Sequence, residues 1–302
     1  MVVSAADSLI PPDVRARLAT LRLRKRRSAG GSGHGVHASR QRGAGLEFAQ
    51  YRAYEPGDEL RQVDWKLYAR SDRFFVREAE RESPLTACLL IDATASMAQA
   101  DATRPGWSRL DAARALAACT MELALRQNDR FGIASIGGDG LQVVPAGRGP
   151  RHRDRCLLAL QRMRAHGDWP QAERLRPLWD AIGADALVLL LGDCFDEGAV
   201  ALAERLSAAR REVLAVQLLC VAERDFAFTG AHRFHDPETG EELPGDGAAL
   251  RAGFLARFGA ARETLARRFA AAGIRHATHV LDEPLDAPLR ALFATRGTEP
   301  AA

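Results

Sequence analysis

Residues 85–96 read Leu-Thr-Ala-Cys-Leu-Leu-Ile-Asp-Ala-Thr-Ala-Ser, and this stretch carries the most information about the fold. Its apolar first half predicts a strand that is buried on both faces. Asp92, Thr94 and Ser96 then lie together at the carboxyl end of that strand. A carboxylate and two hydroxyls are the oxygen ligands that Mg²⁺ prefers, and such sites usually retain several waters. We therefore expect a site for Mg²⁺ or Mn²⁺, with an open coordination position that could accept a carboxylate from a partner.

Strand and helix patterns alternate regularly after residue 84. Apolar strands are predicted at 86–91, 131–136, 141–144, 186–191, 213–221 and 275–281. Helices are predicted at 109–126, 154–165, 199–211 and 248–272, with Ser108 as the N-cap of the first. This order predicts an α/β fold with a doubly wound, mostly parallel sheet and helices on both faces. Gly137-Gly138-Asp139-Gly140 predicts a tight hairpin, so one edge strand is expected to run antiparallel.

Asp193 follows the strand predicted at 186–191. In doubly wound sheets, ligands collect outside the carboxyl ends of the strands, where the strand order reverses. In the common strand order, the strands at 86–91 and 186–191 are neighbours. Asp92 and Asp193 are therefore expected to meet at one edge of the sheet, and Asp193 is predicted as the fourth metal-binding residue.

The chain divides by composition into four parts. A basic helical arm with a Gly/Ser linker is expected at 1–35, a small charged β-containing segment at 36–83, the α/β domain at 84–295 and a disordered tail at 296–302. Residues 15–27 hold seven Lys and Arg and no acid, whereas the whole chain has a net charge of only +3. Because the basic charge is local, we expect no nucleic-acid partner.

The basic arm has a narrow apolar stripe formed by Val14, Leu18 and Leu21. Two alternatives follow from it. The stripe could pack on the domain, or residues 14–27 could make a peripheral contact with an anionic membrane surface.

The segment at 36–83 contains a cluster of charged and aromatic residues. The cluster is predicted either as a docking patch for a partner or as a network that holds the segment to the main sheet. Its members are Arg52, Asp58, Arg61, Asp64, Trp65 and Arg70.

The bulk composition is that of an ordinary globular protein, with 302 residues, 47% hydrophobic and 27% charged. No apolar run approaches the roughly 20 residues of a membrane span. The first residues lack the basic and apolar pattern of a secretory signal. We therefore expect a cytoplasmic location, with the inner membrane surface as the alternative. The five cysteines are scattered, which predicts a structural role, and Cys88 and Cys220 lie in apolar strand-like runs, where a reduced cysteine is expected to be buried.

The predicted sheet order and the Asp-x-Thr-x-Ser turn resemble a von Willebrand factor A domain with its metal-ion-dependent adhesion site. More specifically, the chain resembles the bacterial domain-of-unknown-function fifty-eight family. The residues that carry this resemblance are GAGLEF at 43–48, RAYEPGDELRQVDW at 52–65, AR at 69–70 and FHDPETG at 234–240.

The resemblance implies a non-enzymatic module that acts as adaptor for a MoxR-type AAA+ ATPase and recognises a client protein. It also implies that Asp92, Thr94 and Ser96 bind the metal directly and that Asp193 does so through water. The adhesion site normally takes a threonine from a second loop, and Gly167-Asp168-Trp169-Pro170 contains none. Asp168 could replace that threonine, or the position could be lost and the metal affinity weak.

Three other interpretations of the residues stay open. Asp92, Thr94 and Ser96 could form a turn or helix cap without a metal. A metal-dependent phosphatase or other hydrolase could use Asp92 as nucleophile, although Thr94 stands where such enzymes need a second aspartate as general acid. The protein could also be a structural component at the membrane surface.

Overall fold

The computed structural model describes residues 9–25, 48–55, 58, 61, 63–79, 84–101, 104–235 and 242–294. The chain divides into two compact units, residues 27–84 and residues 1–26 together with 85–302. The linker and the tail expected at 28–35 and 296–302 lie outside the described residues.

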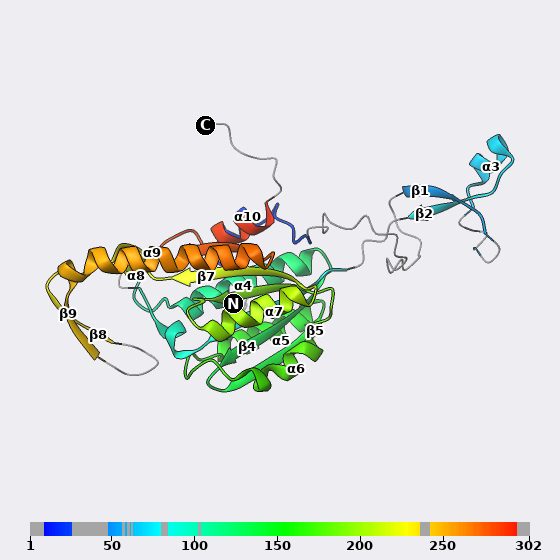
Figure 1. Cartoon of the computed structure of the whole chain (residues 1–302). Helices are drawn as coiled ribbons and strands as arrows, with labels where there is room; N and C mark the ends of the chain where they lie inside the picture. The colour runs from blue at the N-terminus through cyan, green and yellow to red at the C-terminus, as the bar shows by residue number, and fades with distance from the viewer. Residues whose placement is uncertain are drawn as a thin grey trace. The chain divides into compact units, whose positions relative to one another are not determined.

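A six-stranded sheet forms the centre of the larger unit (Figure 1). β4 and β5 pair antiparallel, and the other neighbouring strands are parallel. The predicted doubly wound, mostly parallel sheet with an antiparallel edge is therefore confirmed. Since the chain moves from β3 out to β5 and then returns to β6 beside β3, the strand order reverses between β3 and β6. In spatial order the strands are β10 (Arg275–Val280), β7 (Glu212–Leu219), β6 (Leu187–Gly192), β3 (Thr86–Ala93), β4 (Arg130–Gly137) and β5 (Gly140–Gly147).

Helices cover both faces of the sheet because successive strand residues point to opposite sides. On β3, Leu89 and Ile91 belong to one apolar core and Leu90 to the other. The first core is completed by α4 (Arg109–Arg126), α5 (Pro150–Arg162) and α10 (Ala287–Phe293). The second is completed by α6 (Arg176–Ala181), α7 (Glu197–Ala208) and α9 (Gly247–Ala271). All five cysteines are free and buried, among them Cys88 and Cys220, whose burial was predicted.

Helix α4 begins where the sequence predicts. The Ser108 hydroxyl accepts a hydrogen bond from the backbone N–H of Asp111, and the Asp111 carboxylate accepts one from the backbone N–H of Ser108. This capping box satisfies backbone groups that the first turn leaves unpaired. The first helical residue, Arg109, is consequently held at a defined position beside the carboxyl ends of the strands.

The predicted strand at 213–221 is wrong at its end. β7 stops at Leu219 because Cys220 caps a new helix, α8 (Val221–Asp225), in which Glu223 accepts a hydrogen bond from the Cys220 backbone N–H at 2.8 Å. After α8 the chain forms an antiparallel hairpin of β8 (Ala231–His235) and β9 (Glu242–Asp246), which leads into α9. The sequence analysis did not predict this hairpin.

The basic arm packs on the domain. Its helix α2 (Pro12–Arg17) and the residues after it bury Val14, Leu18 and Leu23 in the same core as α4 and α10. The Arg17 side chain donates a hydrogen bond to Asp286 at 2.7 Å. Of the two alternatives for the arm, this arrangement favours packing on the domain. No helix in the described part of the chain is long and apolar enough to cross a membrane.

The smaller unit contains an antiparallel pair of strands, β1 (Phe48–Ala53) and β2 (Phe75–Ala79), and the short helix α3 (Trp65–Ser71). Asp64 caps α3 by accepting hydrogen bonds from the backbone N–H groups of Lys66 and Leu67, each at 3.0 Å. The Tyr68 and Phe74 rings stack with their centroids 4.3 Å apart.

Candidate functional site

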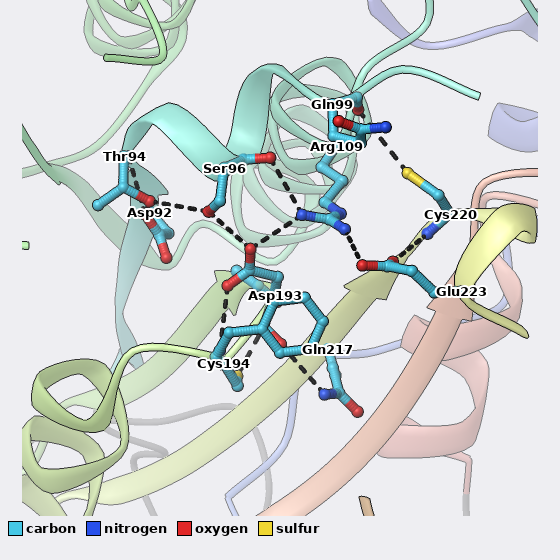
Figure 2. A network of polar contacts seen from close by, with 12 residues as sticks. Asp92, Thr94, Ser96, Gln99, Arg109, Asp193, Cys194, Gln217, Cys220 and Glu223 are labelled. Carbon is cyan, nitrogen blue, oxygen red and sulfur yellow. Dashed lines mark hydrogen bonds and ion pairs between the residues drawn. The ribbon is translucent and has the colours of Figure 1, made fainter. Parts of the chain in front are cut away.

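The four predicted metal-binding residues lie in one chain of hydrogen bonds at the carboxyl ends of β3 and β6 (Figure 2). The Thr94 hydroxyl donates to Asp92 Oδ1 at 2.7 Å and lies 3.2 Å from the Ser96 hydroxyl. The Ser96 hydroxyl donates to Asp193 Oδ2 at 2.7 Å. All four side chains are buried. Two stretches of chain far apart in sequence thus bring two carboxylates and two hydroxyls together.

The strand register brings the two aspartates together. β3 and β6 are parallel neighbours, with Ile91 opposite Leu191, so Asp92 comes beside Gly192 and Asp193 follows directly. A Cβ at Gly192 would lie only 2.8 Å from the Asp92 Cβ and 3.1 Å from Asp92 Oδ2. Glycine at position 192 therefore gives the Asp92 carboxylate the space it occupies.

The site carries excess negative charge. Burial, together with repulsion from the nearby Asp193 carboxylate, raises the pKa of Asp92 to about 7, against the opposing hydrogen bonds from Thr94. A buried carboxylate with a raised pKa lacks sufficient positive charge around its ionised form. A cation at this place would supply that charge.

Arg109 is a built-in counterion on the Asp193 side of the site. Its Nη1 donates to Asp193 Oδ2 at 3.0 Å and to the carbonyl oxygen of Ser96 at 3.0 Å. Its Nη2 donates to Glu223 on α8. The other Asp193 carboxylate oxygen accepts a hydrogen bond from the Phe195 backbone N–H at 3.1 Å.

The sequence analysis missed Arg109 and Glu223. One signal could have identified Arg109, because it precedes Ala113 by four residues and Leu116 by seven and so lies on the apolar face of α4. A charged residue on a buried helix face needs a charged partner. No comparable signal marks Glu223, since α8 is too short for a periodic pattern.

The loop at 166–168, from which the adhesion site would take its second-loop ligand, lies against the turn that follows β3. Ala95 donates its backbone N–H to the Gly167 carbonyl at 2.8 Å, and His166 donates to the Ala93 carbonyl at 3.0 Å. The next residue, Asp168, is exposed. Among the described residues, no hydrogen bond or ion pair joins Asp168 to any of the four site residues, so its role as a further ligand stays a prediction.

The donor set fits a hard cation such as Mg²⁺. Asp92, Thr94 and Ser96 offer oxygen ligands from a single turn, and water would complete the coordination. Asp193 already accepts hydrogen bonds from Ser96, Arg109 and the Phe195 backbone, which suits contact with the cation through water. In the described ranges, no group of three or more His, Cys, Asp or Glu side chains could hold a metal, so a cation at this place would also need hydroxyl and water ligands.

The alternative of a metal-free turn accounts for part of this geometry. Asp92 Oδ1 accepts a hydrogen bond from the Thr94 backbone N–H at 2.9 Å, as in an Asx turn. Thr94 precedes the 3₁₀ turn η2 (Ala95–Ala98), but its side chain makes no capping hydrogen bond there. The Thr94 hydroxyl contacts Asp92 and Ser96 instead.

The charged and aromatic cluster of the smaller unit takes part in local structure. Besides capping α3, Asp64 accepts a hydrogen bond from the Tyr51 hydroxyl at 3.0 Å, and Asp58 accepts one from the Glu55 backbone N–H at 2.9 Å. Trp65, Arg61 and Arg70 are exposed. The Arg52 side chain lies outside the described part.

Comparisons with known proteins identify relatives whose function is not established. Uncharacterised proteins of Mycobacterium bovis and Mycobacterium tuberculosis are each 29% identical to this chain over 273 residues, which cover 87% of this chain and 83% of theirs.

Two solved structures are similar at lower levels. The BatB protein of Bacteroides thetaiotaomicron has a TM-score of 0.37 at 13% identity and covers 63% of this chain and 98% of its own. The VWA domain of SpRpn10 has a TM-score of 0.42 at 13% identity, and the match covers 69% of this chain and 95% of that domain. The sequence model of the family described as "Protein of unknown function DUF58" matches residues 50–264. The chain therefore belongs to the DUF58 family.

Proposed function

We propose that this protein is a non-enzymatic protein-interaction module whose binding depends on Mg²⁺ or Mn²⁺. The observation that carries the proposal is the convergence of Asp92, Thr94, Ser96 and Asp193 at the point where the strand order reverses. Asp92, Thr94 and Ser96 would hold the cation, and Asp193 would contact it through water. The cation would leave a coordination position for an acidic side chain of the partner.

A hydrolase that uses Asp92 finds less support in the site. Thr94 occupies the position of the general acid that such a reaction needs, and a threonine hydroxyl does not donate a proton to a leaving group at neutral pH. The Thr94 hydroxyl is also engaged with Asp92 itself.

The proposed partner is a MoxR-type AAA+ ATPase, with the protein as an adaptor that presents a client to it in the cytoplasm. This part of the proposal rests on the family resemblance. Asp168 as a further ligand and the patch around Trp65 as a second contact are subordinate predictions of the same proposal.

Metal binding is tested by calorimetry and by thermal unfolding with MgCl₂ or MnCl₂ against EDTA. A ligand that binds only the folded state raises its stability by mass action, by about 2.7 kcal/mol at a hundred times the Kd. We expect the cation to stabilise the wild type and to leave Asp92→Ala unchanged. Asp180→Ala is the matched control, because Asp180 is exposed on α6. An equal response of all three proteins contradicts the proposed site.

Partner binding is tested with a purified MoxR-type ATPase from the same organism. We expect at least a tenfold loss of affinity in EDTA and in Asp92→Ala, and none in Asp180→Ala. Binding that survives both the chelator and Asp92→Ala would leave the turn with a structural role only. Turnover of a generic phosphate ester that is lost in Asp92→Asn would instead favour the hydrolase.

A further inference from the structure

A continuous row of aromatic rings extends from the candidate site to the β8–β9 hairpin. The Phe195 ring contacts Phe258 with centroids 6.1 Å apart, and Phe258 stacks on Phe254 at 5.4 Å. Phe254 stacks on Phe226 at 4.4 Å, and Phe226 stacks on Phe234 of β8 at 5.6 Å. With Phe228, which lies 5.0 Å from Phe226, the row contains six of the chain's 12 phenylalanines. We call these six rings, with Leu243 and Leu250, the aromatic ridge.

The two leucines extend the ridge on the hairpin and on α9. Leu243 on β9 pairs directly with Phe234 on β8, and residues opposite each other in an antiparallel pair share a face. A Cβ at Gly245 would lie 2.5 Å from Leu250 and 3.6 Å from Phe234, so both side chains border the same space.

The ridge is more exposed than a core requires. Leu243 is 66% exposed, Phe195 49% and Leu250 41%. The described part of the larger unit has only one other exposed large apolar side chain, Leu158. Phe226 is buried, but none of the six rings belongs to either core of the sheet. Exposed apolar side chains gathered in one place indicate an interaction surface.

The ridge begins at the candidate site. The Phe195 backbone N–H binds the Asp193 carboxylate, and the Arg109 guanidinium lies over the Phe195 ring, 5.3 Å from its centroid. The hairpin and the first turns of α9 lie at the end of the sheet toward which β7 points (Figure 1). A partner that reaches the cation site with an acidic side chain could therefore contact the ridge with its neighbouring residues.

The first part of α9, which carries Leu250, Phe254 and Phe258 of the ridge, is positively charged. From Gly247 to Arg262, α9 contains three arginines and no acid. Arg251 donates to a backbone carbonyl oxygen and Arg262 to a threonine hydroxyl. Arg257, three residues after Phe254, is exposed and has no hydrogen bond or ion pair to another residue in the described ranges. An acidic partner would supply a carboxylate to Arg257, whereas Arg251 already lies near the Asp225 carboxylate.

We propose that the aromatic ridge is a docking surface for an acidic protein segment that carries large apolar side chains. The apolar side chains pack on Phe195, Leu243 and Leu250, and the carboxylates face the arginines of α9. The inference names the partner chemistry of the proposed function and rests on it for the contact with the cation. The occupant that we assign to the ridge is this protein segment, and binding of an anionic lipid surface is an outcome of the test that would overturn the assignment.

The test selects binders from a displayed library of random peptides on the wild-type protein. We expect the selected peptides to combine Asp or Glu with Phe, Leu or Trp. Their affinity, measured by fluorescence anisotropy on synthetic peptides, is expected to fall at least tenfold for Leu243→Ser/Leu250→Ser and for Arg257→Glu. Leu243→Ser alone serves as a milder variant. Leu158→Ser and Arg151→Glu on α5 are matched controls, since both residues are exposed there.

Three results would overturn the inference: a library that yields no such peptides, equal binding by the double variant, or binding to phosphatidylglycerol vesicles that is lost in Leu243→Ser. The last would assign the ridge to a membrane. Each measurement is made in Mg²⁺ and in EDTA, also with Asp92→Ala. If the ridge variants weaken peptide binding but EDTA and Asp92→Ala do not, the proposed function is refuted and the ridge stands. If EDTA and Asp92→Ala weaken peptide binding but the ridge variants do not, the ridge is refuted and the proposed function stands.

Discussion

Asp92 is the residue at which the electrostatic state of the site can be measured. In the unfolded chain its pKa is near the ordinary aspartate value of 3.8, and burial beside Asp193 raises the pKa in the folded state to about 7. Between these values the folded state binds more protons than the unfolded state. The unfolding free energy therefore falls as pH rises from about 4 to about 7, and it stays low above that range.

We predict that Asp92→Asn stabilises the protein in EDTA at pH 8, on the order of 2–4 kcal/mol, and much less at pH 4. The amide oxygen can still accept the Thr94 hydrogen bonds, so the turn is retained. Urea unfolding at the two pH values measures the difference. In MgCl₂ at pH 8 the advantage of the variant should shrink, because only the wild type binds the cation. Equal stability of both proteins at all pH values in EDTA would contradict the raised pKa.

Gly192 tests the packing beside the same carboxylate. A methyl group there would crowd Asp92 on a backbone without positive φ, so the effect is steric. We predict that Gly192→Ala costs about 1–3 kcal/mol of stability and weakens cation binding, because Asp92 must move. Gly183→Ala is the control, since a Cβ at Gly183 would have no neighbour within 4 Å. Full cation affinity in Gly192→Ala would show that the Asp92 position is not critical.

At the scale of elements, strands and their order could be predicted well, and short connections could not. The strands at 86–91 and 186–191 are nearly uninterrupted apolar runs, and burial on both faces produces that signal. The β8–β9 hairpin has no such signal, because its strands are mostly exposed and contain Pro244 and Gly245. α8 and α10 are too short for a helical period to show.

In the candidate site too, some residues could be predicted from the sequence and others could not. Its four oxygen-bearing residues could be predicted, because each follows or ends a recognisable strand. The network of Arg109 and Glu223 could not, because it depends on how α4, α8 and the loop after β6 meet in space. Contacts between elements depend on tertiary packing, which local patterns do not report.

Arg109 connects α4, on which it lies, to Asp193 after β6 and to Glu223 on α8. Replacing it by methionine leaves Asp193 and Glu223 buried or half-buried without their counterion. We predict that Arg109→Met lowers the unfolding free energy by about 3–5 kcal/mol in EDTA. Arg109→Met/Asp193→Asn should lose less than the sum of the single variants, because the orphaned charge is removed. Denaturant unfolding of the four proteins gives the coupling energy, and additive losses would contradict the ion pair.

At the scale of the whole molecule, the arm closes the core between α4 and α10. Leu18 is buried with α4, and the Arg126 guanidinium at the end of α4 donates to the Leu18 carbonyl at 2.8 Å. Gln127 forms hydrogen bonds with both the N–H and the carbonyl of Leu23. Residues near the beginning of the chain therefore belong to the same cooperative unit as the sheet.

We predict that Leu18→Ser lowers the unfolding free energy by about 2–5 kcal/mol, because a buried apolar side chain is lost and a hydroxyl is buried in its place. Arg22→Ser, an exposed change in the same arm, should leave stability within about 0.5 kcal/mol. Urea unfolding measures both. If the arm served instead as a membrane contact, Leu18→Ser would leave stability unchanged and Arg22→Ser would weaken binding to anionic vesicles, since the arm's basic residues would then face the lipid.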